Sequence, residues 1–262
     1  MANQWPTIGK ELAHIEQATL EEVKDFFFRF YAPNNAILAV TGNICFEEAV
    51  RLTEKWFGGI PRRDVPVRNL PQEPEQTEER RLVVERNVPL DALYMTYHMC
   101  DRNHANYFAH DILSDVLSNG RSSRLTQHLV QERQIFSSID AYISGSIDAG
   151  LFHITGKPAN GVSLETAEAA VREELEELQQ TRVAERELEK VKNKFESTQI
   201  FGNMNYLNVA TNLAWYELLS SAEDMEKEVT RYRSVTAEQL RDVAQQTFRK
   251  ENGVVLYYQK KA

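Results

Sequence analysis

The sequence predicts an α+β protein built from two related domains, the first of them only partly present. Strands and helices are both expected along the chain, and an internal repeat links its two ends. Four of the eight prolines fall within residues 61–80, a stretch with many charges and few large apolar side chains. We therefore expect the remnant of a first domain in residues 1–60, a linker in 61–80 and a complete second domain in 81–262.

The repeat has an offset of 217 residues, which places Thr19 opposite Thr236 and Leu38 opposite Val255 without a gap. Each copy contains a threonine-capped amphipathic helix, an asparagine-containing turn and a short apolar strand. The alternative is a chance likeness, because any two amphipathic helices followed by strands look alike. With the second domain starting near residue 81, a true repeat places the start of the first about 136 residues before Met1.

The first segment contains signals for two helices and one strand. Thr19 and Glu22 have the spacing of a capping box, which predicts the start of a helix that Pro33 ends. The apolar run Ala36–Thr41 predicts a strand, because a Gly-Asn turn follows it. A second helix is expected over Phe46–Phe57.

The second segment opens with alternating apolar and polar residues, which is the pattern of half-buried strands. The elements expected here are strands over 81–88 and 92–98, helices over 107–117 and 123–134, a hairpin over 138–156, further helices to 249, and a last strand over 253–258. Residues 164–199 are highly charged with spaced Leu and Val. That composition is typical of solvent-facing helices with a narrow buried stripe.

Composition and charge exclude several classes of partner. The apolar fraction is 42% and the charged fraction 26%, as in ordinary globular domains. A net charge of −9 argues against nucleic acid as a partner. No apolar run approaches the roughly 18 residues that a membrane-spanning helix needs, so we expect no membrane contact.

One tight cluster of potential metal ligands occurs, formed by His98, Cys100, Asp101 and His104. Its spacing matches none of the common zinc frames, which show paired CxxC or HxxxH halves. His98 and Cys100 also share one face of a predicted strand, where both side chains can simply pack. We expect no metal at this cluster.

Several segments resemble pitrilysin/insulinase-type zinc metallopeptidases. Trp5–Gly9, Phe30–Ala36 and Val40–Asn43 look like the closing part of the catalytic domain of that family. Phe57–Pro61 looks like the exit into its interdomain linker, and Ser118–Leu125 resembles a loop and helix start of its second, non-catalytic domain. The resemblance covers nearly the whole chain, and the two homologous domains of the family account for the repeat.

The resemblance implies two α+β domains, each an antiparallel sheet packed with helices, that face each other like a clam shell. In that family, zinc is held in the first domain by two His of an HxxEH motif and a distant Glu, and the motif's own Glu activates water. Here no two of the six histidines lie four residues apart. The resemblance therefore implies zinc in the parent enzyme, and no catalytic or metal-binding residue in this chain.

A substrate-binding loop is the one site that the resemblance implies here. Its residues are Gly120, Arg121, Ser122, Ser123 and Arg124. The alternative is structural, namely a glycine at a helix C-terminus followed by a serine N-cap, and both roles can hold together.

The family's Arg and Tyr, seven residues apart, help to position substrate, but Val130 and Ser137 occupy the matching positions here. Neither can bind an anion as a guanidinium does. Whether Arg133 and Tyr142 take their place stays open.

The resemblance implies the substrate-enclosing, non-catalytic part of a zinc endopeptidase that hydrolyses peptides or unfolded segments. Its partners would be a peptide substrate and the missing N-terminal zinc-binding part or a catalytic partner chain; a homodimer is left open. The alternative is a catalytically inactive partner or structural subunit of a larger assembly. We expect a bacterial, cytoplasmic protein, with the periplasm as the other compartment to consider.

Overall fold

The computed structural model describes residues 9–67, 69, 71, 73–145 and 147–261. Of the Trp5–Gly9 motif, only Gly9 lies among them. The chain forms two compact units: residues up to 75 together with 200–226, and residues 76–199 together with 227 onward. Residues 200–226 therefore group by contacts with the N-terminal segment, whereas the predicted domain boundaries at 60 and 80 stay a prediction.

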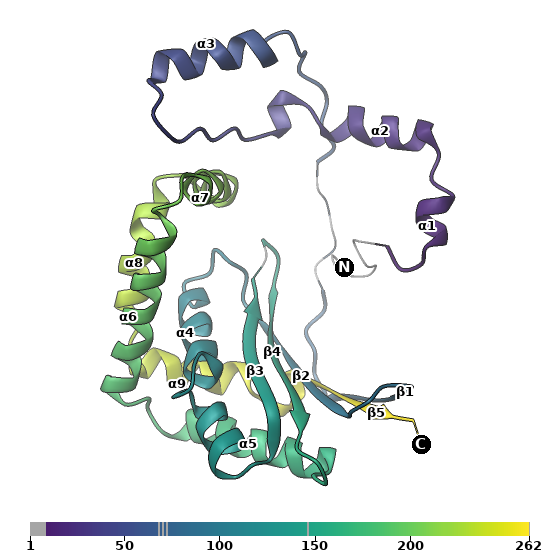
Figure 1. Ribbon diagram of the computed structural model, residues 1–262, viewed down its shortest axis with the longest axis vertical. Coiled ribbons are helices and arrows are strands. Elements are labelled where there is room, and N and C mark those ends of the chain that lie inside the picture. Colours follow the sequence, from purple (N-terminus) through teal and green to yellow (C-terminus); the bar gives the residue numbers. More distant parts are fainter. Residues whose placement is uncertain (1–8, 68, 70, 72, 146, 262) are drawn as a thin grey trace. The chain divides into compact units, whose positions relative to one another are not determined.

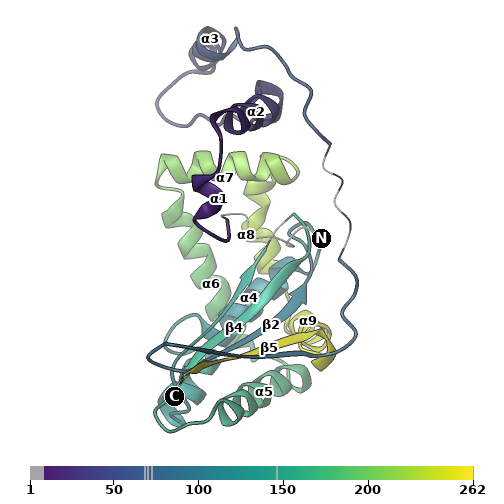
Figure 2. The same ribbon diagram turned by 90° about the vertical axis from the view of Figure 1, so that its right-hand side faces the viewer.

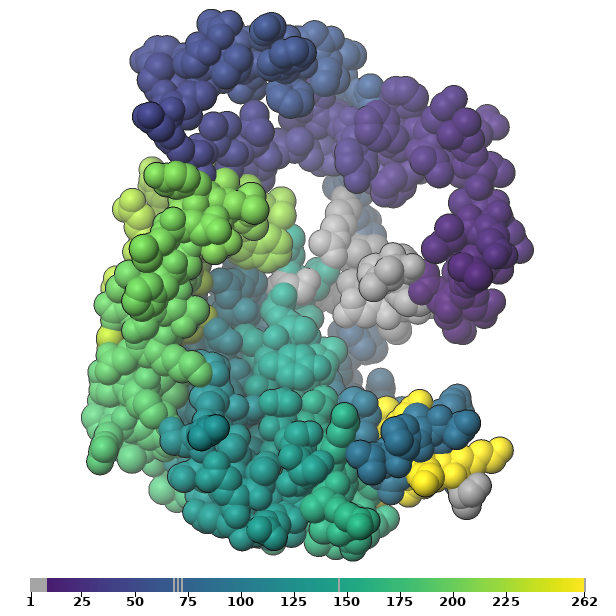
Figure 3. All heavy atoms as spheres, viewed as in Figure 1, coloured from purple at the N-terminus to yellow at the C-terminus, as the bar shows by residue number. Residues whose placement is uncertain are grey.

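The second unit is built on a five-stranded sheet with the order β1-β5-β2-β4-β3 (Figure 1). Its strands are β1 (Arg80–Arg86), β2 (Ala92–Met99), β3 (Phe136–Ser144), β4 (Gly150–Pro158) and β5 (Gly253–Lys260). The expected α+β fold with an antiparallel sheet packed against helices is confirmed. The exception is the pairing of β1 with β5, which is parallel. The C-terminal strand β5 lies between β1 and β2. It pairs with β2 in antiparallel and with β1 in parallel, so β1 and β2 run in opposite directions. Figure 3 shows β1 and β5 side by side.

One face of this sheet carries the hydrophobic core. Burial alternates along β2, where Leu93, Met95 and Tyr97 are buried and the intervening residues are more exposed. Three helices pack with the strands on the buried side (Figure 2): α4 (Tyr107–Ser118), α5 (Leu164–Gln180) and α9 (Ala237–Thr247). The expected strands, the hairpin and these helices are thus confirmed to within a few residues.

The helix expected over 123–134 is a π-helix, η2 (Leu125–Glu132). The Arg133 N–H donates to the His128 carbonyl, five residues back, at 2.9 Å. Both Leu125 and Leu129 are fully buried, so the wide helix still presents an apolar face to the core. Gln134 ends it with a φ of +51°.

Two long helices follow α5, namely α6 (Glu185–Gly202) and α8 (Asp224–Ser234). Within the second unit, the Phe195 ring of α6 stacks on the Tyr232 ring of α8 at a centroid distance of 3.5 Å. None of the helices in the described part of the chain is both long and apolar enough to cross a membrane.

The first unit contains α1 (Ala13–Glu16), α2 (Leu20–Phe30), α3 (Phe46–Phe57) and α7 (Tyr206–Leu219). The strand predicted over Ala36–Thr41 is wrong, because this stretch pairs with no strand among the described residues. Its apolar side chains and those of α2 are largely exposed, and an apolar pocket of about 630 Å³ lies between them. A stretch of β propensity becomes a strand only when a ladder partner is present.

The repeat is visible in the local structure of both copies. The helices α2 and α9 span equivalent residues at the offset of 217, and each begins after a threonine. Thr19 Oγ1 accepts a hydrogen bond from the Glu22 N–H at 3.3 Å, and Thr236 Oγ1 accepts one from the Gln239 N–H at 3.1 Å. The expected helix start at Thr19 is thereby confirmed.

The turns after these helices also match. Each is a short 3₁₀-helix, η1 (Pro33–Asn35) and η3 (Lys250–Asn252). The Asn35 side chain donates to the Phe30 carbonyl at 2.8 Å, and Asn252 donates to the Thr247 carbonyl at the same distance. Because an identical side-chain hydrogen bond recurs at the same offset, a chance likeness of two helices explains the repeat poorly.

Candidate functional site

The predicted substrate-binding loop follows the end of α4. Gly120 has a φ of +108°, in the left-handed region that favours glycine. Just before it, Asn119 closes the helix, because its side chain donates to Asp115 Oδ1 at 2.7 Å and its own N–H donates to the Asp115 carbonyl. The loop therefore begins as a glycine-terminated helix end.

Two of the five predicted loop residues are held by the fold. Ser123 is buried, and its Oγ donates to the Gly120 carbonyl at 2.7 Å. Arg124 makes a bidentate pair with Glu187 at 3.1 and 2.9 Å and reaches Glu177 at 3.4 Å. With 11% of its side chain exposed, Arg124 ties the loop to α5 and α6.

The other three loop residues, Gly120, Arg121 and Ser122, are exposed. Lys190 of α6 donates to the Ser122 carbonyl at 3.0 Å and approaches its hydroxyl at 3.2 Å. Ser122 also lines a depression of about 830 Å³ beside α6. The backbone of the loop is therefore fixed while the Arg121 side chain stays at the surface.

The positions of the family's Arg and Tyr pair have structural roles. Val130 packs against the core, and the Ser137 hydroxyl donates to the Lys157 carbonyl at 3.0 Å. Of the two residues considered as replacements, Arg133 pairs with Glu173 at 2.7 Å. Tyr142 instead stacks on a histidine ring of the neighbouring strand, with 4.9 Å between ring centroids.

The cluster of potential metal ligands does not fit zinc. Asp101 Oδ1 accepts from the Asn103 N–H at 2.8 Å, and His104 Nδ1 accepts from the Asn106 N–H at 3.1 Å. Burial raises the pKa of the Cys100 thiol to about 11, which disfavours the thiolate that binds metal. Throughout the described residues, no group of three or more His, Cys, Asp or Glu side chains could hold a metal ion.

A buried histidine that the sequence analysis did not single out lies near this cluster. His110 Nε2 is 2.9 Å from the Thr247 hydroxyl, and its Nδ1 is 2.9 Å from the Asn106 carbonyl. Burial lowers the pKa of His110, so the ring is neutral at physiological pH. These contacts join α4 to α9, which indicates a structural role. No sequence signal indicates this link between the helices, because Thr247 lies 137 residues away from His110.

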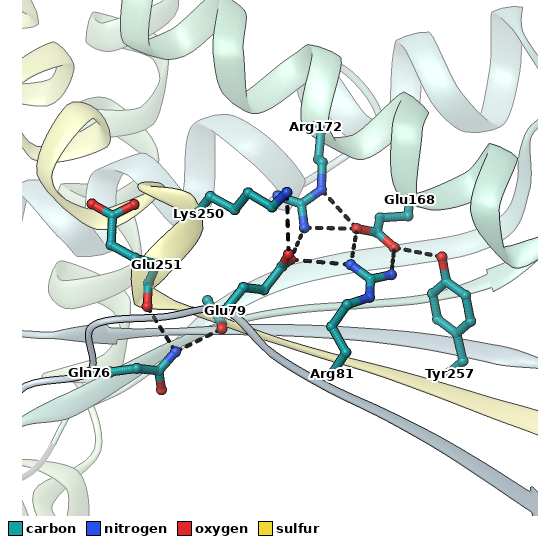
Figure 4. A network of polar contacts seen from close by, with 9 residues as sticks. Gln76, Glu79, Arg81, Glu168, Arg172, Lys250, Glu251 and Tyr257 are labelled. Atoms are coloured by element: carbon teal, nitrogen blue, oxygen red, sulfur yellow. Dashed lines mark hydrogen bonds and ion pairs between the residues drawn. The ribbon is translucent and has the colours of Figure 1, made fainter.

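A second polar group that the sequence did not indicate is centred on Glu168 of α5 (Figure 4). Glu168 accepts a bidentate pair from Arg81 at 2.9 and 2.6 Å, one bond from Arg172 at 2.8 Å and one from the Tyr257 hydroxyl at 2.6 Å. Burial raises the pKa of Glu168, but these hydrogen bonds outweigh it and lower the pKa to about 2. The carboxylate thus joins α5 to β1 and β5.

The same network fastens the chain just before β1. The buried Gln76 side chain donates to the Glu251 carbonyl at 3.0 Å and to the Gly253 carbonyl at 2.8 Å. Glu79 contacts Arg172 and pairs with Arg81 at 3.2 Å (Figure 4). Attachment to the second unit therefore starts at residue 76, within the stretch predicted as a linker.

Known proteins of similar sequence and structure indicate the family of this chain. One curated relative is "Zinc protease PqqE" of Helicobacter pylori, which is 28% identical over 191 residues, or 72% of this chain and 43% of that protein. The chain spans about half the length of the curated relatives that it matches.

Two solved structures show the same fold. A protease from Helicobacter pylori has a TM-score of 0.88 at 23% identity, covering 95% of this chain and 61% of that one. A peptidase M16 inactive domain from Pseudomonas fluorescens has a TM-score of 0.82 at 16% identity, covering 96% and 60%.

The model of the family described as "Peptidase M16 inactive domain" matches residues 17–195, which is more than half of the chain. This match confirms the resemblance drawn from the sequence. The chain belongs to the family of the peptidase M16 inactive domain.

Proposed function

We propose that this chain is the non-catalytic, substrate-enclosing part of a zinc-dependent endopeptidase that hydrolyses peptides or unfolded segments. The observation that carries the proposal is the match to an inactive peptidase domain across residues 17–195. It is supported by relatives named as zinc proteases and by histidine spacing that does not form HxxEH. In this proposal, zinc and the water-activating glutamate belong to a part of the parent protein outside this chain.

The sheet of the second unit supplies a surface suited to enclosing a peptide. Tyr94, Thr96 and His98 of β2 lie on the face opposite the hydrophobic core and are partly exposed. The substrate would lie along this face, where the exposed Tyr94 ring and hydroxyl offer apolar contact and a hydrogen bond without a fixed sequence requirement.

The loop Gly120–Arg124 is proposed to contact the substrate. Because Ser123 and Arg124 are engaged inside the fold, the direct contact would come from Arg121, with the backbone of Gly120 and Ser122. A guanidinium at the surface binds a peptide carboxylate or carbonyl oxygen without reorganising the loop.

The domain organisation is part of the same proposal: a first-domain remnant in 1–60, a linker in 61–80 and the second domain in 81–262. The repeat supports it, because equivalent positions are exposed in the first copy and buried in the second. Phe26 is 56% exposed and Val243 1%, while Leu38 is 58% exposed and Val255 2%. The first copy therefore has the side chains of a core without the elements that cover them.

Activity measurements test the proposal directly. The purified chain, with or without added zinc, should not cleave a fluorogenic peptide library or a reduced, alkylated protein. Chelator-sensitive cleavage by homogeneous material would overturn the non-catalytic assignment.

A substitution in a longer protein that carries an HxxEH segment would test the loop. There, Arg121→Ala should lower kcat/KM by about threefold to tenfold, as expected for the loss of one charged contact. Arg182→Ala removes another exposed guanidinium, which is already paired with Glu238 and has no proposed role, so it serves as the matched control. Equal effects of the two substitutions would remove the loop from the proposal.

A further inference from the structure

A polar pocket lies on the helix-covered side of the sheet, between α5 and the turn that follows α9. Its volume is about 530 Å³, and Tyr97 of β2 lines it together with Arg172 of α5 and the consecutive residues Arg249 and Lys250. None of the roles proposed above uses this pocket, and it lies on the side of β2 opposite Tyr94.

The Tyr97 hydroxyl is the unusual group in this pocket. Tyr97 is 2% exposed, and its ring packs edge-on against Phe248 with 5.3 Å between centroids. No described residue forms a hydrogen bond with the hydroxyl. Burial raises the pKa of Tyr97 to about 12, so it keeps its proton at physiological pH. The hydroxyl borders the pocket, so this donor is available to a molecule bound there.

Arg172 supplies further donors next to the hydroxyl. Its Nε donates to Glu168 at 2.8 Å and its Nη2 contacts Glu79 and Glu168 (Figure 4). No described residue accepts a hydrogen bond from Nη1. Two carboxylates therefore hold the guanidinium in place and leave one of its amino groups unused. A donor that is held in this way loses little entropy when it binds a ligand.

Two more cations lie at the exposed part of the pocket. Arg249 uses its Nε for the Gln246 carbonyl at 3.0 Å and its Nη1 for Glu251 at 3.3 Å, so its Nη2 remains for a ligand. The Lys250 side chain is 74% exposed, and its ammonium lies 3.8 Å from Glu79 Oε2. Glu176 and Glu251 also line the pocket, and the carboxylate of Glu251 is already paired with Arg249.

We propose that this pocket binds a small oxyanion, either a carboxylate or a phosphate, between the Tyr97 hydroxyl and the guanidinium of Arg172. Both ligands offer the same chemistry, namely several acceptor oxygens around one negative charge centre. Arg249 and Lys250 then attract the anion to the opening of the pocket. The inference stands apart from the peptidase proposal, because it uses neither the loop nor the open face of the sheet.

Titration calorimetry on the whole chain tests this inference, with inorganic phosphate and acetate as separate probes and ionic strength held constant with sodium chloride. At least one probe should bind saturably with one site per chain, and the comparison of the two decides between phosphate and carboxylate. Tyr97→Phe should weaken binding about tenfold, as the loss of one hydrogen bond to a charged group implies. Tyr94→Phe makes the same chemical change on the opposite face of β2 and should leave binding unchanged.

Two further measurements make the outcome decisive. Arg249→Gln should also weaken binding, whereas Arg133→Gln, at a surface ion pair elsewhere, should not. In anion-free buffer, Tyr97→Phe should keep the thermal midpoint of the wild type, because the hydroxyl forms no hydrogen bond with a described residue. Saturable binding that is unaffected by Tyr97→Phe and Arg249→Gln, an absence of binding by both probes, or a lower midpoint of Tyr97→Phe without anion would each overturn the proposal.

Discussion

Substituting Glu168→Gln should destabilise the second unit by about 2–3 kcal/mol at pH 7. The substitution keeps the size of the side chain but removes the charge that Arg81 and Arg172 share. Breaking a buried ion pair costs about 3–5 kcal/mol when both partners are desolvated. Here Arg81 is 45% exposed, so water compensates part of its lost partner and the expected loss falls to the bottom of that range or just below it.

The pKa of Glu168 gives a second route to the magnitude. It falls from 4.5 to about 2 on folding, which corresponds to at most about 3 kcal/mol in favour of the folded state. Because the folded-state pKa is lowered, this contribution is complete above pH 4.5 and is lost as the pH falls from 4.5 towards 2. The wild type should therefore lose stability across that interval, and Glu168→Gln should lack this part of the loss.

Native-state hydrogen exchange is the suitable assay, because it reports on β1 and β5 separately from the first unit. Tryptophan fluorescence does not serve, since the tryptophans that the structure describes, Trp56 and Trp215, lie outside the second unit. The matched control is Glu173→Gln on the same helix, where the pair with Arg133 is exposed on both sides and should contribute less than about 0.5 kcal/mol. If both variants exchange alike at β1 and β5, the network does not hold these strands and the reasoning fails.

Three other substitutions are expected to separate structural roles. Asn252→Ala should lower the free energy of unfolding by about 1–3 kcal/mol, because the side chain donates to two partly buried carbonyls. Asn35→Ala should change it little, since Asn35 is exposed. Urea unfolding followed by far-UV circular dichroism compares the two variants. Gly120→Ala should cost about 1–2 kcal/mol in the same assay, because φ is +108° there, and an unchanged midpoint would show that the loop relaxes. Asp111→Asn should stabilise the protein near neutral pH. Burial raises the pKa of Asp111 above 3.8, so the stability that the protonated carboxyl contributes is complete below pH 3.8 and is lost as the pH rises through the raised value. The asparagine carries no charge at any pH and avoids that loss. A thermal midpoint measured at several pH values checks this, and a variant that is less stable near neutral pH would show that the ionised carboxylate is well accommodated beside the Tyr232 hydroxyl.

Local signals in the sequence predicted most elements of the fold. The spacing of Thr19 and Glu22 marks a helix start because both hydrogen bonds of a capping box form within one turn. The alternation along β2 likewise reflects a local rule, since neighbouring side chains point to opposite faces. Such features require no knowledge of the rest of the chain.

Long-range pairing was the part that local patterns did not indicate. The position of β5 between β1 and β2 joins residues far apart in sequence, and nothing in either strand specifies a parallel partner. The same limit explains the site. Arg124 belongs to a segment that resembles a substrate loop, yet its partner Glu187 lies 63 residues away and turns it inward. Glu168 was likewise one acid among many on a charged helix until Arg81, from 87 residues upstream, came into contact with it.

The two copies of the repeat show that strand formation depends on the adjacent strand as well as on the sequence. Ala36 is extended and follows a 3₁₀ turn, as Gly253 does at the start of β5, and the residues after both are apolar. In the second copy, Asn252 also donates to the His98 carbonyl at 2.9 Å, which ties the turn to the adjacent strand β2. Among the described residues, the side chain of the equivalent Asn35 donates only to its own helix. Since the helix, its cap, the turn and the asparagine hydrogen bond agree in the two copies, the difference between a strand and an unpaired segment lies in the adjacent strand, which the first copy lacks among the described residues.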